Sequence, residues 1–105
     1  MVTVSFLGDK TLLTGFQISG HSGYAEAGSD IVCASVSSCA YMVANTVTDV
    51  LGLPARAEAF DGAMLLKISK ADALPAQAIL KGFLLHVQAL AEQYPAYLQC
   101  NTQNI

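Results

Sequence analysis

Charged side chains are scarce in this sequence. Only 12% of its 105 residues are charged, against about 25% in typical globular domains, and 53% are hydrophobic. A chain this short cannot bury so much apolar surface within itself, and an oligomer interface is the usual place for the excess. We therefore expect a single domain over residues 1–105 that pairs with a second copy as a homodimer.

Basic residues are few and scattered. Five Lys and Arg stand against eight Asp and Glu, for a net charge of -3, and no run of basic residues occurs. This excludes the electrostatic footprint of a nucleic-acid-binding protein. A partner rich in basic residues would meet no general repulsion.

Cysteine pairs and targeting signals are also missing. The three cysteines include no Cys-x-x-Cys pair, which argues against a disulfide framework and a structural zinc site. The N-terminal MVTVSFLGDK lacks the charged and apolar regions of a secretory signal. We therefore expect a cytoplasmic protein with reduced thiols and no cofactor. Residues 31–48 are uncharged, but their polar side chains predict a buried helix instead of a membrane span: Ser35, Ser37, Ser38, Asn45, Thr46 and Thr48.

The first half of the chain has the pattern of two strands and a helix. Alternating apolar residues predict strands over 2–7 and 12–19, with Gly15 marking a bulge. A helix is predicted from an N-cap at Ser29-Asp30 to Gly52. It is apolar on most faces, so we expect the sheet on one side and a partner subunit on another.

The second half repeats this order. Residues 56–60 and 63–69 predict a hairpin with an Asp61-Gly62 turn. A helix over 73–94, capped by Asp72, and a short strand over 97–101 follow. The order ββαββα plus a terminal strand predicts an α+β two-layer domain, with a mostly antiparallel or mixed sheet and two helices packed on it. The second helix has a core stripe of Ile79, Phe83, Leu84, Val87, Leu90, Ala91 and Tyr94.

A glycine-rich loop separates a histidine from a cysteine. Residues 20–29 carry three glycines, Gly20, Gly23 and Gly28, and no apolar period, so we expect a loop that can open and close. His21 begins this loop, and Cys33 lies in the first turn of the predicted helix. A helix N-terminus and an imidazolium both stabilise a thiolate, and unpaired N–H groups of that turn could receive an oxyanion.

Each of these residues also has an ordinary structural interpretation. A His and a Cys twelve positions apart are a weak signal, because a Cys in an apolar helix is usually a small core residue. Cys39 and Cys100 are interpreted as core residues, and His86 as a partly exposed helical residue. Asp30 either starts the helix or orients the histidine. Ser37 shares the face of Cys33, or bonds its own helix backbone.

The string G-H-x(7)-S-D-I-V-C-A-x-x-S, residues 20–37, resembles the signature of the ribosomal-processing cysteine protease family, often called Prp. The resemblance covers nearly the whole chain. It implies a homodimeric Cys/His protease in which His21 and Cys33 are catalytic, with Asp30 and Ser37 in support. The implied substrate is a large-subunit ribosomal protein (number twenty-seven), whose N-terminal extension is removed so that it can enter the ribosome.

This sequence departs from the family pattern in the loop at 22–28 and in the polar C-terminal YLQCNTQNI. Both departures leave the predicted dyad unchanged and bear on substrate recognition. Two other functions stay open at this point. A non-catalytic, dimeric, ribosome-associated interaction module would bind without cutting, and a thiol redox sensor would use Cys33 without needing His21.

Overall fold

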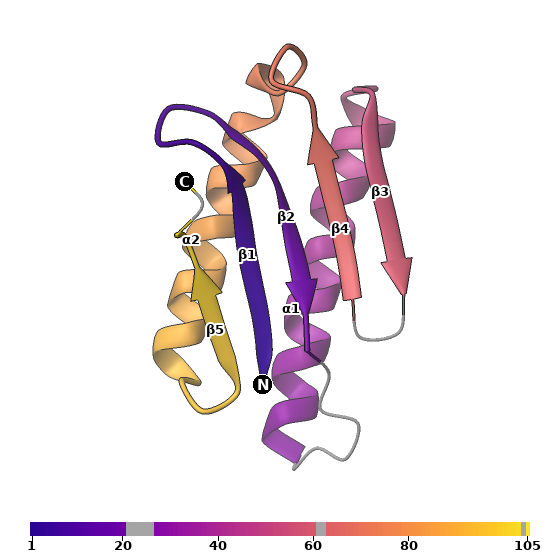
Figure 1. Cartoon of the computed structure of the whole chain (residues 1–105). Coiled ribbons are helices and arrows are strands. Elements are labelled where there is room, and N and C mark those ends of the chain that lie inside the picture. The colour runs from indigo at the N-terminus through magenta and orange to yellow at the C-terminus, as the bar shows by residue number, and fades with distance from the viewer. Residues whose placement is uncertain (21–26, 61–62, 104) are drawn as a thin grey trace.

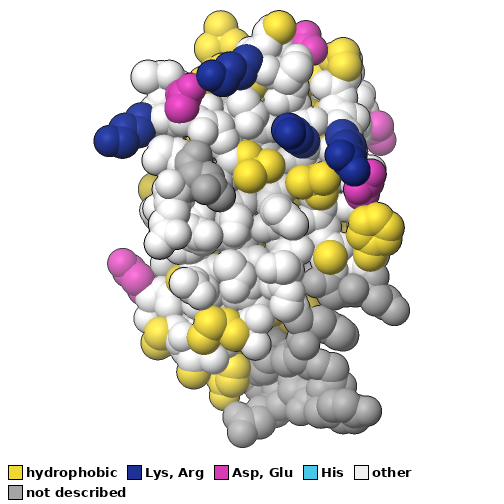
Figure 2. All heavy atoms as spheres, in the orientation of Figure 1, with side chains coloured by type: hydrophobic (Ala, Val, Ile, Leu, Met, Phe, Trp, Pro, Cys, Tyr) yellow, Lys and Arg dark blue, Asp and Glu magenta, His cyan; other side chains and the backbone are white. Residues whose placement is uncertain are grey.

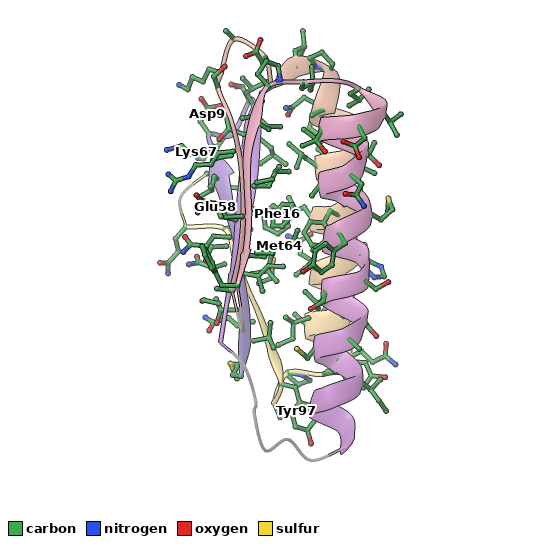
Figure 3. All side chains as sticks on the ribbon, turned by 90° about the vertical axis from the view of Figure 1, so that its right-hand side faces the viewer. Asp9, Phe16, Glu58, Met64, Lys67 and Tyr97 are labelled. Atoms are coloured by element: carbon green, nitrogen blue, oxygen red, sulfur yellow. The ribbon has the colours of Figure 1, made fainter. Side chains whose placement is uncertain are left out.

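The protein is a single sheet with helices on one side. The computed structural model describes residues 1–20, 27–60, 63–103 and 105. Five strands form a sheet in the order β3-β4-β2-β1-β5, and both long helices cover the same face of it (Figures 1 and 3). The predicted α+β two-layer class is therefore confirmed. The elements are β1 (Val2–Gly8), β2 (Leu13–Ser19), α1 (Ala27–Asn45), a π-helical turn (Thr46–Val50), β3 (Ala55–Phe60), β4 (Ala63–Ile68), a 3-10 turn (Leu74–Ala76), α2 (Gln77–Gln93) and β5 (Leu98–Asn101).

The strand pairings make the sheet mixed. β1 pairs antiparallel with β2, β2 with β4, and β4 with β3, with Phe60 opposite Ala63 in the second hairpin. β5 pairs parallel with β1, with Val2 opposite Leu98. A parallel neighbour needs a crossover connection, and α2 supplies it. The predicted last strand is thus confirmed.

Alternation along the strands places the core between the sheet and the helices. Val4 and Phe6 of β1 are fully buried on the helix side. The ring of Phe83 on α2 packs against Phe6 and Phe16, with centroids 5.6 and 4.8 Å apart. Figure 3 shows Phe16 extending into this space, while Glu58 lies on the open side of the sheet.

Two glycines of the first half have the roles predicted for them. Gly15 marks a bulge: Leu7 pairs with Gly15 but Gly8 pairs with Leu13, so Thr14 of β2 is an extra residue beside it. A Cβ at Gly15, where φ is +151°, would overlap the carbonyl oxygen of Leu66 on β4, so glycine allows the two strands to approach. Gly52, with φ of +64°, follows the π-helical turn and ends the helical segment as predicted.

The helix starts differ from the predicted ones. α1 begins at Ala27, before the predicted cap at Ser29-Asp30. Asp72 does not cap the second helix, because its carboxylate accepts a hydrogen bond from Ser69 Oγ at 2.8 Å and the 3-10 turn has no side-chain cap. Pro75 lies in the first turn of this 3-10 segment, where a missing N–H costs little.

Both helices are long and apolar enough to cross a bilayer by length and composition alone, over Ile31–Val50 and Leu74–Gln93. In the structure each helix turns a buried stripe onto the sheet, as core helices of a globular domain do. Only 33% and 22% of the two segments are buried, so apolar side chains remain at the surface. The predicted partner subunit would cover these exposed side chains.

Candidate functional site

The chain segments that carry the predicted dyad meet at one end of the molecule, called here the loop end. β2 finishes there at Ser19, and α1 starts there (Figure 1). Gly20 has a φ of +85°, and a Cβ on it would overlap the carbonyl oxygen of Met1, so only glycine fits beside the start of β1. His21 and Gly23 lie outside the described residues. The point where the loop leaves the sheet is therefore fixed by close backbone packing.

Cys33 lies farther into its helix than predicted. Because α1 begins at Ala27, Cys33 is its seventh residue and belongs to the second turn. Only the first four N–H groups of a helix lack an intrahelical partner, so the N–H of Cys33 is not a free donor for an oxyanion. The favourable dipole also weakens beyond the first turn. The start of α1 likewise places Gly28 and Asp30 in the first turn of the helix and not in the loop.

The side chain of Cys33 is positioned between core and surface. It is half-buried, is not in a disulfide and packs against the core cluster formed by the sheet and both helices. One turn along α1, Ser37 is also half-buried. The i and i+4 spacing puts these two side chains on the same helix face. A thiol and a hydroxyl therefore share one partly accessible strip of α1.

The Ser37 hydroxyl differs from other hydroxyls of the helical segment. Ser35 Oγ donates to the carbonyl of Ile31 at 2.9 Å. The hydroxyls of Thr46 and Thr48 likewise donate to the carbonyls four residues earlier in the chain, at 2.8 and 3.0 Å. Ser37 makes no such bond within the described part of the chain, so its hydroxyl can serve a ligand. The structure thus does not bear out the interpretation that Ser37 bonds its own helix backbone.

The remaining cysteines and the second histidine are placed as the sequence predicted. Cys39 and Cys100 are half-buried and pack against the core, and burial raises the pKa of both thiols. His86 is exposed on α2. Over residues 1–20, 27–60, 63–103 and 105, no three His, Cys, Asp or Glu side chains converge to hold a metal ion.

Tyr97 is a residue of the loop end that sequence reasoning missed. Its carbonyl accepts a hydrogen bond from the N–H of Val2 at 2.9 Å, which holds it at the start of β1. Figure 3 shows its half-buried ring on the helix side of the sheet, at the end where α1 begins. Only the parallel pairing of β5 with β1 brings it there, and that pairing has no signature in the sequence.

The charges of the molecule are distributed unevenly along its long axis. All five Lys and Arg fall outside residues 11–55 and before residue 82. They lie toward the end opposite the loop end, called here the turn end because it holds the β1–β2 turn (Figure 2). At the loop end, Glu92 is exposed in the last turn of α2. Among the described residues, the loop end therefore carries no Lys or Arg side chain.

Comparisons with known proteins found one matching family profile and several similar structures. A sequence profile described as "Cysteine protease Prp" matches residues 1–99. SMU.848 from Streptococcus mutans has a similar structure, with 29% identity, a TM-score of 0.78 and coverage of 98% of this chain and 96% of that one. A search of curated protein sequences found no significant match.

Two further similar structures are of the essential ribosomal processing protease Prp from S. aureus. One contains a substrate peptide and is 24% identical, with a TM-score of 0.86 and coverage of 98% of this chain and 100% of that one. The other contains a covalently linked product peptide and is 25% identical, with a TM-score of 0.82 and the same coverage.

Proposed function

The chain belongs to the cysteine protease Prp family, and from this premise we propose that it is an endopeptidase with Cys33 as nucleophile and His21 as general base and acid. The observation that carries the proposal is the position of Cys33: a half-buried thiol on α1, at the end where the glycine-rich segment leaves the sheet. The S. aureus protease with a covalently linked product supports nucleophilic catalysis within this fold.

The proposed reaction has two steps. The Cys33 thiolate attacks the scissile carbonyl, the C–N bond breaks, and the His21 imidazolium gives its proton to the departing amine. His21 then takes a proton from water, and the resulting hydroxide attacks the thioester. The peptide carboxylate leaves and the thiol is restored. Asp30 supports this chemistry by orienting His21 in the proposal.

The position of Cys33 in the second turn changes the proposed source of the oxyanion donor. Its own N–H is held within the helix, so another group must stabilise the tetrahedral intermediate. The Ser37 hydroxyl lies on the same face, one turn away, and makes no bond to the helix backbone within the described residues. We assign it this role. Gly20 and Gly23 then let the segment that carries His21 close over the bound peptide.

The proposed substrate is the N-terminal extension of a large-subunit ribosomal protein (number twenty-seven), cut in the cytoplasm by a homodimer. Ribosomal processing is the activity of the similar S. aureus protease. The charge distribution supports a basic substrate, since the described loop end has no Lys or Arg side chain and the net charge is -3. Interaction without cutting and thiol redox sensing are the competing functions, and a cleavage assay separates them from proteolysis.

The first prediction is loss of cleavage when either member of the dyad is removed. The extended ribosomal protein is incubated with the enzyme and followed by intact mass. Cys33→Ala and His21→Ala are expected to abolish the product, while thermal unfolding stays close to wild type. Cys39→Ala and His86→Ala are matched controls, because one is a half-buried thiol of the same helix and the other an exposed imidazole. Both should cleave normally.

Two outcomes would contradict the assignment. A product formed by Cys33→Ala would remove the nucleophile. Tight binding of the extended protein by wild type, with no product and no change in Cys33→Ser, would favour the interaction module. A redox sensor would show a reversible oxidation product at Cys33 that persists in His21→Ala.

A further inference from the structure

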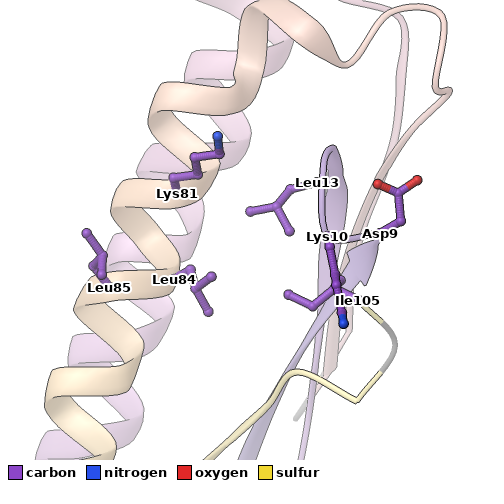
Figure 4. Close-up of a pocket in the computed structure, with 7 residues that line it drawn as sticks. All are labelled: Asp9, Lys10, Leu13, Lys81, Leu84, Leu85 and Ile105. Atoms are coloured by element: carbon purple, nitrogen blue, oxygen red, sulfur yellow. The ribbon is translucent and has the colours of Figure 1, made fainter.

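An apolar pocket lies at the turn end, away from the candidate site. Its volume is about 430 Å³, within the range of small-molecule sites. It opens between the β1–β2 turn and α2 (Figure 4). Leu13 and Leu84 face each other across it, and Leu85 lies at its outer margin. The lining residues are Asp9, Lys10, Leu13, Lys81, Leu84, Leu85 and Ile105.

Hydrogen bonds hold both walls of the pocket in place. In the turn, Asp9 Oδ1 accepts bonds from the N–H groups of Thr11 and Leu12 and from the Thr11 hydroxyl, at 2.7 to 2.9 Å. Two hydrogen bonds join the turn to the helix. The N–H of Leu13 donates to Gln77 Oε1 at 2.9 Å, and Gln77 Nε2 donates to the carbonyl of Leu13 at 2.7 Å. A ligand would therefore meet preformed walls and need not order them.

The charges at the rim favour an anion. Lys10 and Lys81 form no ion pair with any residue that the structure describes. Figure 4 shows them at different sides of the pocket, with the Asp9 carboxylate beyond Leu13. That carboxylate is already engaged by the turn and by Lys70, whose Nζ lies 3.4 Å from Asp9 Oδ2. Two uncompensated ammonium groups thus flank an apolar floor.

We propose that this pocket binds an amphiphilic anion: a carboxylate, or a comparable single anionic group, on an apolar chain of roughly eight to twelve carbons. The chain would lie between Leu13 and Leu84, and the anionic head would lie at the rim between Lys10 and Lys81. Cys33 does not line this pocket and lies toward the loop end on α1, so the site is separate from the proposed nucleophile.

The test uses decanoate, below its micelle concentration, with the full chain and isothermal titration calorimetry. Affinity should rise about fourfold for each added methylene, and so roughly 15-fold at each two-carbon step from hexanoate to octanoate to decanoate. Lys10→Gln and Lys81→Gln should each weaken decanoate binding several-fold. Lys67→Gln is the matched control, since Lys67 is exposed on the sheet and does not line the pocket. It should bind like wild type. Cys33→Ala should bind decanoate like wild type, which would show that this site is independent of the proposed nucleophile.

Three results would overturn the proposal. Equal binding of decyltrimethylammonium would remove the role of the lysines. Equal losses in Lys67→Gln and Lys81→Gln would indicate attraction to the surface without a site. A chain mass that falls when Lys81 or Leu85 is replaced would show that a second copy occupies the pocket.

Discussion

At the scale of single residues, Ser35 and Ser37 are a natural pair for testing the proposed oxyanion donor. They lie two positions apart on α1, but only the Ser35 hydroxyl is bonded to the helix backbone, at 2.9 Å from the Ile31 carbonyl. Ser37→Ala is expected to lower kcat by about 100-fold with little change in KM, because the hydroxyl acts in the transition state. Ser35→Ala should leave both constants unchanged. Steady-state kinetics on the extended ribosomal protein make the comparison, and equal effects would remove the role of Ser37.

Asp9 gives a prediction for the pH dependence of stability. Hydrogen bonds from Thr11, from the backbone of Leu12 and from Lys70 lower the pKa of Asp9 from 3.8 to about 2. A carboxyl whose folded pKa lies below its unfolded value stabilises the fold above the unfolded value, and this contribution is lost as pH falls. Asp9→Asn should therefore be less stable than wild type at pH 7, with the gap closing between about pH 4 and pH 2.

Urea unfolding at several pH values measures that gap. Asp49→Asn is the control, because Asp49 is an exposed carboxylate outside any ion pair among the described residues. A difference between Asp9→Asn and wild type that stays constant down to pH 2 would show that the charge of Asp9 does not stabilise the turn.

At the scale of elements, two glycines should respond to alanine with opposite signs. A Cβ at Gly15 of β2 would overlap the carbonyl oxygen of Leu66, at a φ of +151°. Gly15→Ala is expected to lower the free energy of unfolding by roughly 1–3 kcal/mol. Gly82 lies in α2, and a Cβ added there would meet nothing within 4 Å. Gly82→Ala should therefore raise the free energy of unfolding by about 0.5–1 kcal/mol. Chemical denaturation measures both, and a stable Gly15→Ala would contradict the close approach of β2 and β4.

Most elements could be predicted because their signals are local. Alternation predicts β1 and β2, and Gly52 ends the helical segment. The second hairpin was predicted from Asp61-Gly62 between apolar runs, and its strands pair as expected, while the two turn residues lie outside the described residues. The start of α1 was predicted three residues late. A Ser-Asp pair is a typical cap, but an acidic residue is equally favourable within the first turn of a helix, so this local signal does not determine the first residue of α1.

At the scale of the whole molecule, the sequence predicted the family better than it predicted how distant segments are arranged. The family signature depends on residue identities at fixed spacing, and the family match over residues 1–99 agrees with it. The depth of Cys33 within α1 depends on where packing starts the helix. The positions of Tyr97 and of the turn-end pocket depend on contacts between distant segments, such as the amide of Gln77 with Leu13. No local pattern encodes such contacts.

The proposed homodimer is argued from the outer faces of the helices. Apolar side chains remain exposed there: Ile31, Tyr41 and Met42 on α1 are at least half exposed. A partner that covers them would account for the apolar surplus of the sequence, because monomers seldom leave contiguous apolar patches in water. A second copy meeting the same face gives the two-fold contact typical of small oligomers.

Mutations can distinguish a dimer interface on the outer face of α1 from one at the edge strand β3. Wild type is expected to have twice the chain mass of 11.0 kDa by sedimentation equilibrium at micromolar concentration. Tyr41→Arg with Met42→Arg should give the single-chain mass, since two buried, unpaired charges oppose association. Phe60→Arg is the matched control, because Phe60 is 67% exposed but lies on the edge strand β3. A monomeric wild type would end the dimer proposal, and dissociation by Phe60→Arg alone would move the interface to β3, where unpaired backbone groups invite strand pairing.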